Sequence, residues 1–137
     1  MACVPEPKLN VLDSSAFDNY FLQAQKVRQL VKNDFNRAFV LPDRLNKRSG
    51  TSDDGVDVLI HASAIRAAPP LREEGGLSTY VQDVLTVPAS LAGVPALSVP
   101  AGVGRDGWPV GVSIVGQWGS ELSLLQVGGI VSRIAGE

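Results

Sequence analysis

Residues of the types that perform catalysis are few in this chain, and their spacing does not bring them together. The only histidine, His61, ends an apolar stretch, and neither a nucleophile nor an orienting partner accompanies it locally, as general base catalysis requires. Ser113 lies in Gly111–Gly116, which misses the Gly-x-Ser-x-Gly turn of serine hydrolases by one position. Cys3, the only cysteine, excludes an internal disulfide and a cysteine-based zinc cluster. We therefore interpret His61 as structural and Ser113 as part of a strand face.

Three further groups of residues resemble ligand-binding patterns without meeting their requirements. Gly102–Gly104 is not followed by Gly-Lys-Ser/Thr or by a third glycine that opens a helix, so a phosphate-binding loop is not expected. The aspartates within 53–57 do not have the spacing of a calcium loop. The basic run within 44–48 has no interleaved aromatic residue. These patterns predict a hairpin turn and solvated loops, with no metal site and no self-contained catalytic site.

Asp83 has a different setting from these groups. It falls on a segment of helical pattern, flanked by apolar residues, just before the turn that Pro88 interrupts. From composition alone, an exposed helical acid is the simpler interpretation. A functional role for Asp83 needs an argument beyond composition.

Composition narrows the class of protein. The chain has 137 residues, 12 Lys plus Arg against 14 Asp plus Glu, and 45% hydrophobic residues. This length fits one domain or one piece of a larger one, with enough apolar material for a core. A net charge of −2 argues against a general nucleic-acid binder, which needs a basic excess. No apolar run approaches the roughly 18 residues that span a bilayer, and no targeting peptide is visible at the start.

The first half of the chain is expected to hold one long helix and one strand. Residues 1–13 show no period and are interpreted as an irregular lead-in. Apolar residues at spacings of three or four predict an amphipathic helix over about 15–40, capped by Ser14 or Ser15. Residues 43–55 are polar and predict a surface loop. Val56–Ile60 is almost continuously apolar, as expected for a strand covered on both faces.

The second half is expected to hold a helix, a hairpin and a final helix. A helical pattern from Ser78 is interrupted at Pro88, which favours either a kink or a second helix with Pro88 in its first turn. Residues 96–100 and 109–115 have strand patterns, and the glycine-rich link between them predicts a hairpin. Ser120 is expected to cap the last helix. Three strands make a thin sheet, which hints that the chain lacks partners its strands require.

Three stretches resemble the C-terminal region of amidase-signature enzymes. Tyr80–Pro100 contains the specific run Thr-Val-Pro-Ala-x-Leu-Ala-Gly, Asn19–Arg28 resembles the family's long helix, and Gly107–Gly116 resembles its final strand. The resemblance covers about residues 14–135. Within the family it is strongest to the A subunits of glutamyl-tRNA(Gln) amidotransferases. It implies an α/β fold, a mixed sheet covered by helices, of which this chain supplies the incomplete C-terminal portion as one segment, 14–137.

The resemblance implies an enzyme that releases ammonia from glutamine and passes it to a partner protein, which amidates Glu on tRNA(Gln). Family catalysis uses a Ser nucleophile, a cis-Ser and a Lys base. The serine motif, Gly-Gly-Ser-Ser-Gly-Gly-Ser, is absent from this chain. None of its lysines stands in the family's lysine context: Lys8, Lys26, Lys32 and Lys47. No catalytic residue is therefore assigned, and the chain alone is expected to be inactive.

One binding residue carries over from the family. The aspartate of the "Tyr-x-x-Asp…Thr-Val-Pro" run faces the bound glutamine and pairs with its α-ammonium group, and Asp83 occupies that position. A carboxylate suits this task because it binds an ammonium through charge-assisted hydrogen bonds. The family's arginine for the glutamine carboxylate precedes the long helix, and residues 1–13 do not match that region.

The resemblance also implies partners and a compartment. The partners are the other amidotransferase subunits and glutamine, with tRNA reached only through the complex, and no membrane. No cofactor is expected in this chain, since ATP and Mg²⁺ belong to the partner subunit. The long 43–55 loop is interpreted as a eukaryotic variation, of which a fungal mitochondrial protein is one case. The resemblance implies the mitochondrial matrix if the source is a eukaryote, and otherwise the cytoplasm. The alternatives are a segment of another amidase-signature hydrolase of small amides and a non-catalytic interaction module.

Overall fold

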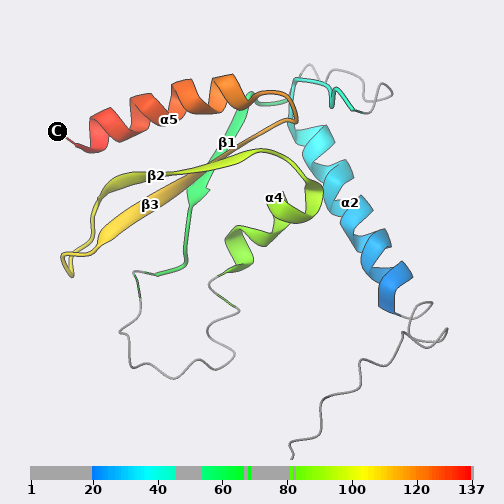
Figure 1. Ribbon diagram of the computed structural model, residues 1–137, viewed down its shortest axis with the longest axis horizontal. Helices are drawn as coiled ribbons and strands as arrows, with labels where there is room; N and C mark the ends of the chain where they lie inside the picture. Colours follow the sequence, from blue (N-terminus) through cyan, green and yellow to red (C-terminus); the bar gives the residue numbers. More distant parts are fainter. Residues whose placement is uncertain (1–19, 46–53, 67, 69–80, 82, 137) are drawn as a thin grey trace, which may run out of the picture.

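The computed structural model describes residues 20–45, 54–66, 68, 81 and 83–136. Its elements follow the predicted order of helix, strand, helix, hairpin and helix (Figure 1). They are α2 (Leu22–Ala38), β1 (Val58–Ala62), the 3₁₀-helix η2 (Asp83–Leu85), α4 (Val87–Ala92), β2 (Ala96–Val103), β3 (Pro109–Gly116) and α5 (Glu121–Ala135). The α/β class predicted from the sequence is confirmed. The lead-in 1–13, the caps Ser14 and Ser15, and most of the 43–55 loop lie outside the described residues.

The described strands form one antiparallel sheet in the order β1-β3-β2, so β3 is the central strand. The predicted hairpin is β2–β3, and its turn is closed by a hydrogen bond from Gly104 N to Trp108 O at 2.8 Å. β2 runs further than expected, to Val103, after an irregularity in register between Pro100 and Val103. β1 begins at Val58 instead of Val56, since Val56 pairs with Phe39 in an isolated parallel bridge.

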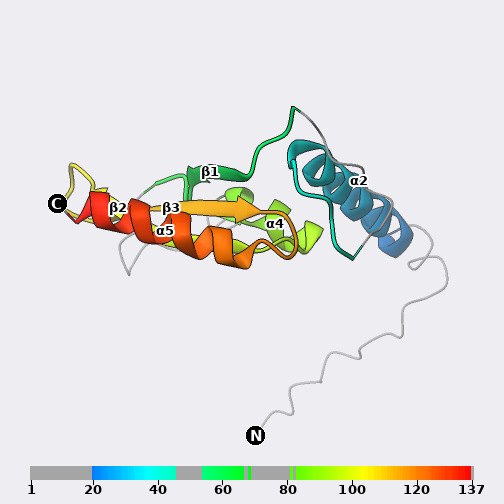
Figure 2. The same cartoon turned by 90° about the horizontal axis from the view of Figure 1, so that it is seen from above.

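Helices cover the two faces of the central strand separately (Figure 1). Successive residues of a strand point to opposite faces. Ile114 packs with Val99 and with Leu124 of α5, whereas Val115 packs with Phe39 and with Ala89 of α4. Figure 2 shows α2 at the end of the sheet away from the chain's C-terminus. The core of the described residues therefore consists of two small apolar clusters, one on each side of β3.

The end of α2 differs from its prediction. The helix stops at Ala38, because Phe39 adopts an extended conformation (φ −93°, ψ 140°). Val56 N then donates to Ala38 O at 2.8 Å, and Val40 N donates to Val56 O at 3.1 Å. A Cβ at Gly55 would lie 2.6 Å from Val40 N, so this crossing requires glycine. A long-range strand contact ends the helix before Pro42 is reached.

Within the 43–55 loop, which is predicted to lie at the surface, Asp43 is buried, whereas Arg44 and Leu45 after it are exposed. Asp43 is 1% exposed, and its Oδ2 lies 3.3 Å from Lys32 Nζ. Its Oδ1 accepts a hydrogen bond from Leu45 N at 2.9 Å. A buried carboxylate needs such partners because desolvation disfavours an unpaired charge. The pair ties the chain after α2 back onto that helix.

Most predicted helix ends in the second half of the chain are confirmed. Pro88 lies in the first turn of a separate helix, α4, and Gly93 ends it in the left-handed region at φ 74°. Ser120 precedes α5 as predicted, but its hydroxyl makes no capping bond to the helix. Instead Ser120 Oγ donates to Gln117 O at 2.6 Å, which closes the turn before the helix.

The two adjacent glycines of α5 predict opposite responses to alanine. A Cβ at Gly128 would approach Leu97 Cδ2 to 2.5 Å and Val99 Cγ1 to 3.2 Å, whereas a Cβ at Gly129 meets nothing within 4 Å. Gly129→Ala should raise the free energy of unfolding by about 0.5–1 kcal/mol through helix propensity. Gly128→Ala should be less stable than Gly129→Ala by about 1 kcal/mol or more, since overpacking opposes the same gain. Urea denaturation of both variants measures the difference, and equal stabilities would contradict the packing of α5 on β2.

Candidate functional site

Asp83 is the first residue of η2, and its side chain is exposed. Its carbonyl oxygen accepts hydrogen bonds from Thr86 N at 3.0 Å and from Thr86 Oγ1 at 3.2 Å. These bonds close the turn that joins η2 to α4. The helical setting predicted for Asp83 is therefore a short 3₁₀ turn that presents the carboxylate to solvent.

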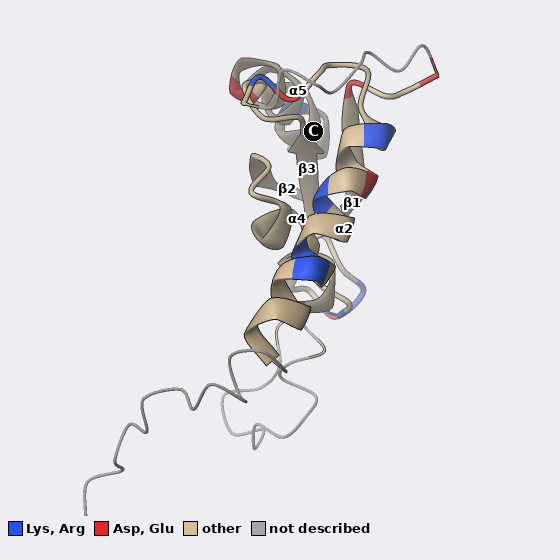
Figure 3. Ribbon diagram, turned by 90° about the vertical axis from the view of Figure 1, so that its right-hand side faces the viewer, with Lys and Arg blue, Asp and Glu red and all other residues tan. Residues whose placement is uncertain are grey.

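α4 anchors this turn to the rest of the molecule. Ala89 and Ala92, on its inner side, are buried. Arg28 Nε of α2 donates to Leu91 O at 2.8 Å, which gives the C-terminal end of α4 a charged hydrogen-bond donor. α4 itself carries no charged residue, whereas Lys and Arg recur along α2 (Figure 3). The position of Asp83 thus depends on packing against the sheet and on one bond from α2.

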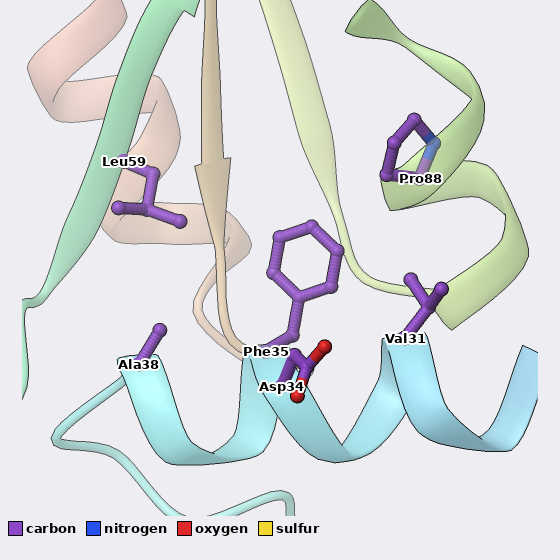
Figure 4. A pocket seen from close by; sticks show the side chains of 6 residues that line it. All are labelled: Val31, Asp34, Phe35, Ala38, Leu59 and Pro88. Atoms are coloured by element: carbon purple, nitrogen blue, oxygen red, sulfur yellow. The ribbon is translucent and has the colours of Figure 1, made fainter. Parts of the chain in front are cut away.

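An apolar groove lies between α2, β1 and α4 (Figure 4). It has a volume of about 360 Å³ and is lined by Val31, Asp34, Phe35, Ala38, Leu59 and Pro88. Its only charged side chain, Asp34, forms an ion pair with Arg37 of the same helix. The groove can accept apolar side chains, but none of its lining groups is a nucleophile paired with a base.

Three serine hydroxyls meet on the sheet. Ser63 Oγ lies 2.6 Å from Ser98 Oγ and 2.9 Å from Ser113 Oγ. The sequence singled out Ser113 alone, because the other two approach it only once the register of the strands is known. His61 is the cross-strand neighbour of Ser113, but its Nδ1 donates to Ala62 O at 2.8 Å. These contacts do not couple the imidazole to a hydroxyl, so they agree with the structural interpretation of both residues.

The described part of the chain holds no group of three or more His, Cys, Asp or Glu side chains placed to bind a metal ion. Asp53, one of the aspartates weighed as a metal ligand, lies outside that part. Among the described helices, none has both the length and the apolar character needed to cross a membrane.

The sequence comparisons agree on one family. The amidase family model matches residues 6–125. The chain is 50% identical over 126 residues to the A subunit of the mitochondrial glutamyl-tRNA(Gln) amidotransferase of Mycosarcoma maydis, covering 85% of this chain and 23% of that protein. It is 42% identical over 129 residues to the mitochondrial A subunit of Tuber melanosporum (89% and 26%). It is 39% identical over 128 residues to the A subunit of Gluconobacter oxydans (92% and 23%). The chain thus spans about a quarter of the length of these relatives.

Solved structures support the same fold. The A subunit of the Thermotoga maritima glutamyl-tRNA(Gln) amidotransferase matches with a TM-score of 0.55 and 27% identity, over 77% of this chain and 20% of that one. 6-Aminohexanoate cyclic dimer hydrolase matches with a TM-score of 0.54 and 27% identity, over 89% of this chain and 24% of that one. The structural likeness is therefore as strong to 6-aminohexanoate cyclic dimer hydrolase as to an amidotransferase subunit.

The serine cluster predicts unequal effects of its members on stability. Ser63 takes part in both hydrogen bonds, and Ser113 is 5% exposed. Ser63→Ala should lower the free energy of unfolding by about 1–3 kcal/mol, because it removes the shared partner of a buried hydroxyl. Ser98→Ala leaves the Ser63–Ser113 bond in place and should cost less than about 1 kcal/mol. Chemical denaturation of the two variants provides the test, and an equal or reversed order would contradict the network.

Proposed function

The chain belongs to the amidase family, and we propose that it is the C-terminal segment of the A subunit of a glutamyl-tRNA(Gln) amidotransferase. In this proposal the whole subunit hydrolyses glutamine and supplies the ammonia that converts Glu-tRNA(Gln) to Gln-tRNA(Gln). The observation that carries the proposal is the 50% identity to the Mycosarcoma maydis protein over 126 residues. In this proposal the chain alone is inactive, because its sequence lacks the family's serine motif and none of its lysines stands in the family's lysine context.

Asp83 is the residue of this chain that binds substrate in the proposal. Its exposed carboxylate pairs with the α-ammonium group of glutamine through charge-assisted hydrogen bonds. Burial of α4 and the bond from Arg28 hold the turn in place, so the carboxylate is oriented before substrate arrives. The group that binds the glutamine carboxylate comes from elsewhere in the subunit.

The proposal includes partners, cofactors and a compartment. The other amidotransferase subunits bind the complete protein, and tRNA is reached only through that complex. In this proposal ATP and Mg²⁺ act at the partner subunit. The mitochondrial names of the fungal relatives favour the mitochondrial matrix as its location.

A segment of an amidase-signature hydrolase of small amides is the second candidate. The match to 6-aminohexanoate cyclic dimer hydrolase, with a TM-score nearly equal to that of the Thermotoga maritima protein, favours it. The two candidates differ in substrate. Only the amidotransferase binds glutamine, and so only it needs a protein carboxylate to pair with the α-ammonium group of that substrate.

Binding of glutamine by Asp83 can be assayed in a chimera in which the chain replaces the matching segment of the Mycosarcoma maydis protein. Asp83→Ala in the chimera should raise KM for glutamine about 10- to 100-fold, since hydrogen bonds to charged groups are worth about 1.5–3 kcal/mol. Asp54→Ala removes another exposed aspartate and should leave KM unchanged. Steady-state glutaminase kinetics measures both values.

Two results would contradict the proposal. A chimera that hydrolyses simple amides but not glutamine would favour the second candidate. An Asp83→Ala chimera with the same KM as the unsubstituted one would remove Asp83 from the binding site.

A further inference from the structure

We propose that the outer face of α5 is a dimer interface, on which the same helix of a second copy of this chain packs in the antiparallel direction. The outer face consists of Glu121, Leu122, Leu125, Gly129 and Arg133. Steps of three or four residues connect them, which places them on one side of the helix. The proposal does not rest on the proposed function, because α5 and α4 cover opposite faces of the sheet.

The outer face is separate from the side of α5 that packs on the sheet. Leu124 is 3% exposed and Gly128 is buried against β2, whereas Leu122 and Leu125 are 70% and 62% exposed. A Cβ at Gly129 would meet nothing within 4 Å, so this glycine leaves an open notch beside Leu125. In Figures 1 and 2, α5 lies at the rim of the described structure, with the sheet on its inner side. The outer face therefore presents apolar side chains and a notch that the packing of α5 on the sheet does not use.

The outer face is complementary to itself in the antiparallel direction. Glu121 lies in the first turn of α5 and Arg133 in the last, and both are exposed. Glu121 is four residues before Leu125, and Arg133 is four residues after Gly129. A register that places Leu125 in the Gly129 notch of the second copy therefore also places Glu121 opposite Arg133 of that copy. A two-fold axis repeats each contact, so a single register satisfies two apolar and two charged contacts.

The charges of α5 favour this direction over a parallel one. Glu121 and Arg133 are the only charged residues of the helix. In a parallel pair each would lie beside its own equivalent, and the like charges would repel. In an antiparallel pair opposite charges meet at both ends, and the two helix dipoles also run in opposite directions. The charge pattern therefore fits a second copy of this chain, related by a two-fold axis, as the partner.

One helix pair makes a small interface. Stable complexes bury about 1,600 Å² in total, and weak ones less than about 1,200 Å². Exposed ion pairs add little affinity and mainly select the partner and its direction. The dimer is therefore expected to be weak, with a Kd of about 10–100 µM. Its Kd should rise with salt, which screens exposed charges.

Sedimentation velocity of the 137-residue chain, over concentrations that bracket this Kd, tests the charged contacts. Glu121→Arg and Arg133→Glu should each raise Kd about tenfold or more, because each places like charges opposite each other at both ends of the pair. An equimolar mixture of the two variants should dimerise about as tightly as the unsubstituted chain, since every charged contact then joins opposite charges again. Each variant alone is the control for misfolding and aggregation, which mixing does not reverse.

Gly129→Leu tests the notch without weakening the monomer. Leucine has a higher helix propensity than glycine, and a Cβ at this position is free of contacts. The variant should therefore keep or raise the free energy of unfolding, measured by urea denaturation below the Kd. Its Kd should rise about tenfold or more, because a side chain fills the notch that receives Leu125 of the second copy. Ile134→Gln, at a 69% exposed position outside this face, should change Kd by less than about twofold.

Four outcomes would overturn the proposal. The first is a chain that stays monomeric up to about 1 mM. The second is an unchanged Kd in Gly129→Leu or in either charge variant, and the third is a mixture of the charge variants that does not regain the dimer. The fourth is a dimeric chain whose chimera with the Mycosarcoma maydis protein is monomeric, since the rest of that protein would then cover α5. None of these outcomes depends on glutaminase activity, so the proposed function is tested separately.

Discussion

The structure depends on burial of the central strand on both faces. Ile114 is 0% exposed and Val115 is 2% exposed, although they are consecutive residues that point in opposite directions. α5 covers Ile114, and Phe39 with α4 covers Val115. Burying one such side chain contributes about 1.5–3 kcal/mol to the free energy of unfolding. β3 therefore fixes the positions of α5 on one face and of Phe39 and α4 on the other. The turn that carries Asp83 is positioned through this contact, because it leads directly into α4.

Features set by local chemistry were predictable from the sequence. Pro88 and Gly93 mark the two ends of α4, and the glycine-rich link marks the β2–β3 hairpin. Features set by contacts between distant residues were not. The end of α2 depends on the bridge from Phe39 to Val56, and the burial of Asp43 depends on Lys32. The period of a pattern indicates which face a residue occupies, but it does not indicate what lies opposite.

The candidate site also combines features that the local sequence indicates with features that depend on contacts between distant residues. From its residues alone, Asp83 is an exposed acid in a short helical turn, and the structure places it there. Its assignment to glutamine came from the motif around it, since one carboxylate without its partner groups does not specify a ligand. The serine cluster is the opposite case, because geometry brings the three hydroxyls together while no motif pointed to Ser63 or Ser98. The apolar pattern of β1 predicted cover that the described residues supply only in part.

These features describe one segment of an amidase, which spans about a quarter of the length of its relatives. The size of the natural protein tests this most directly. An immunoblot of source cells with an antibody against a peptide from residues 43–55 should detect a band several times heavier than 14.5 kDa. A single band at 14.5 kDa in the soluble fraction would contradict the assignment and direct the search for function to partner binding.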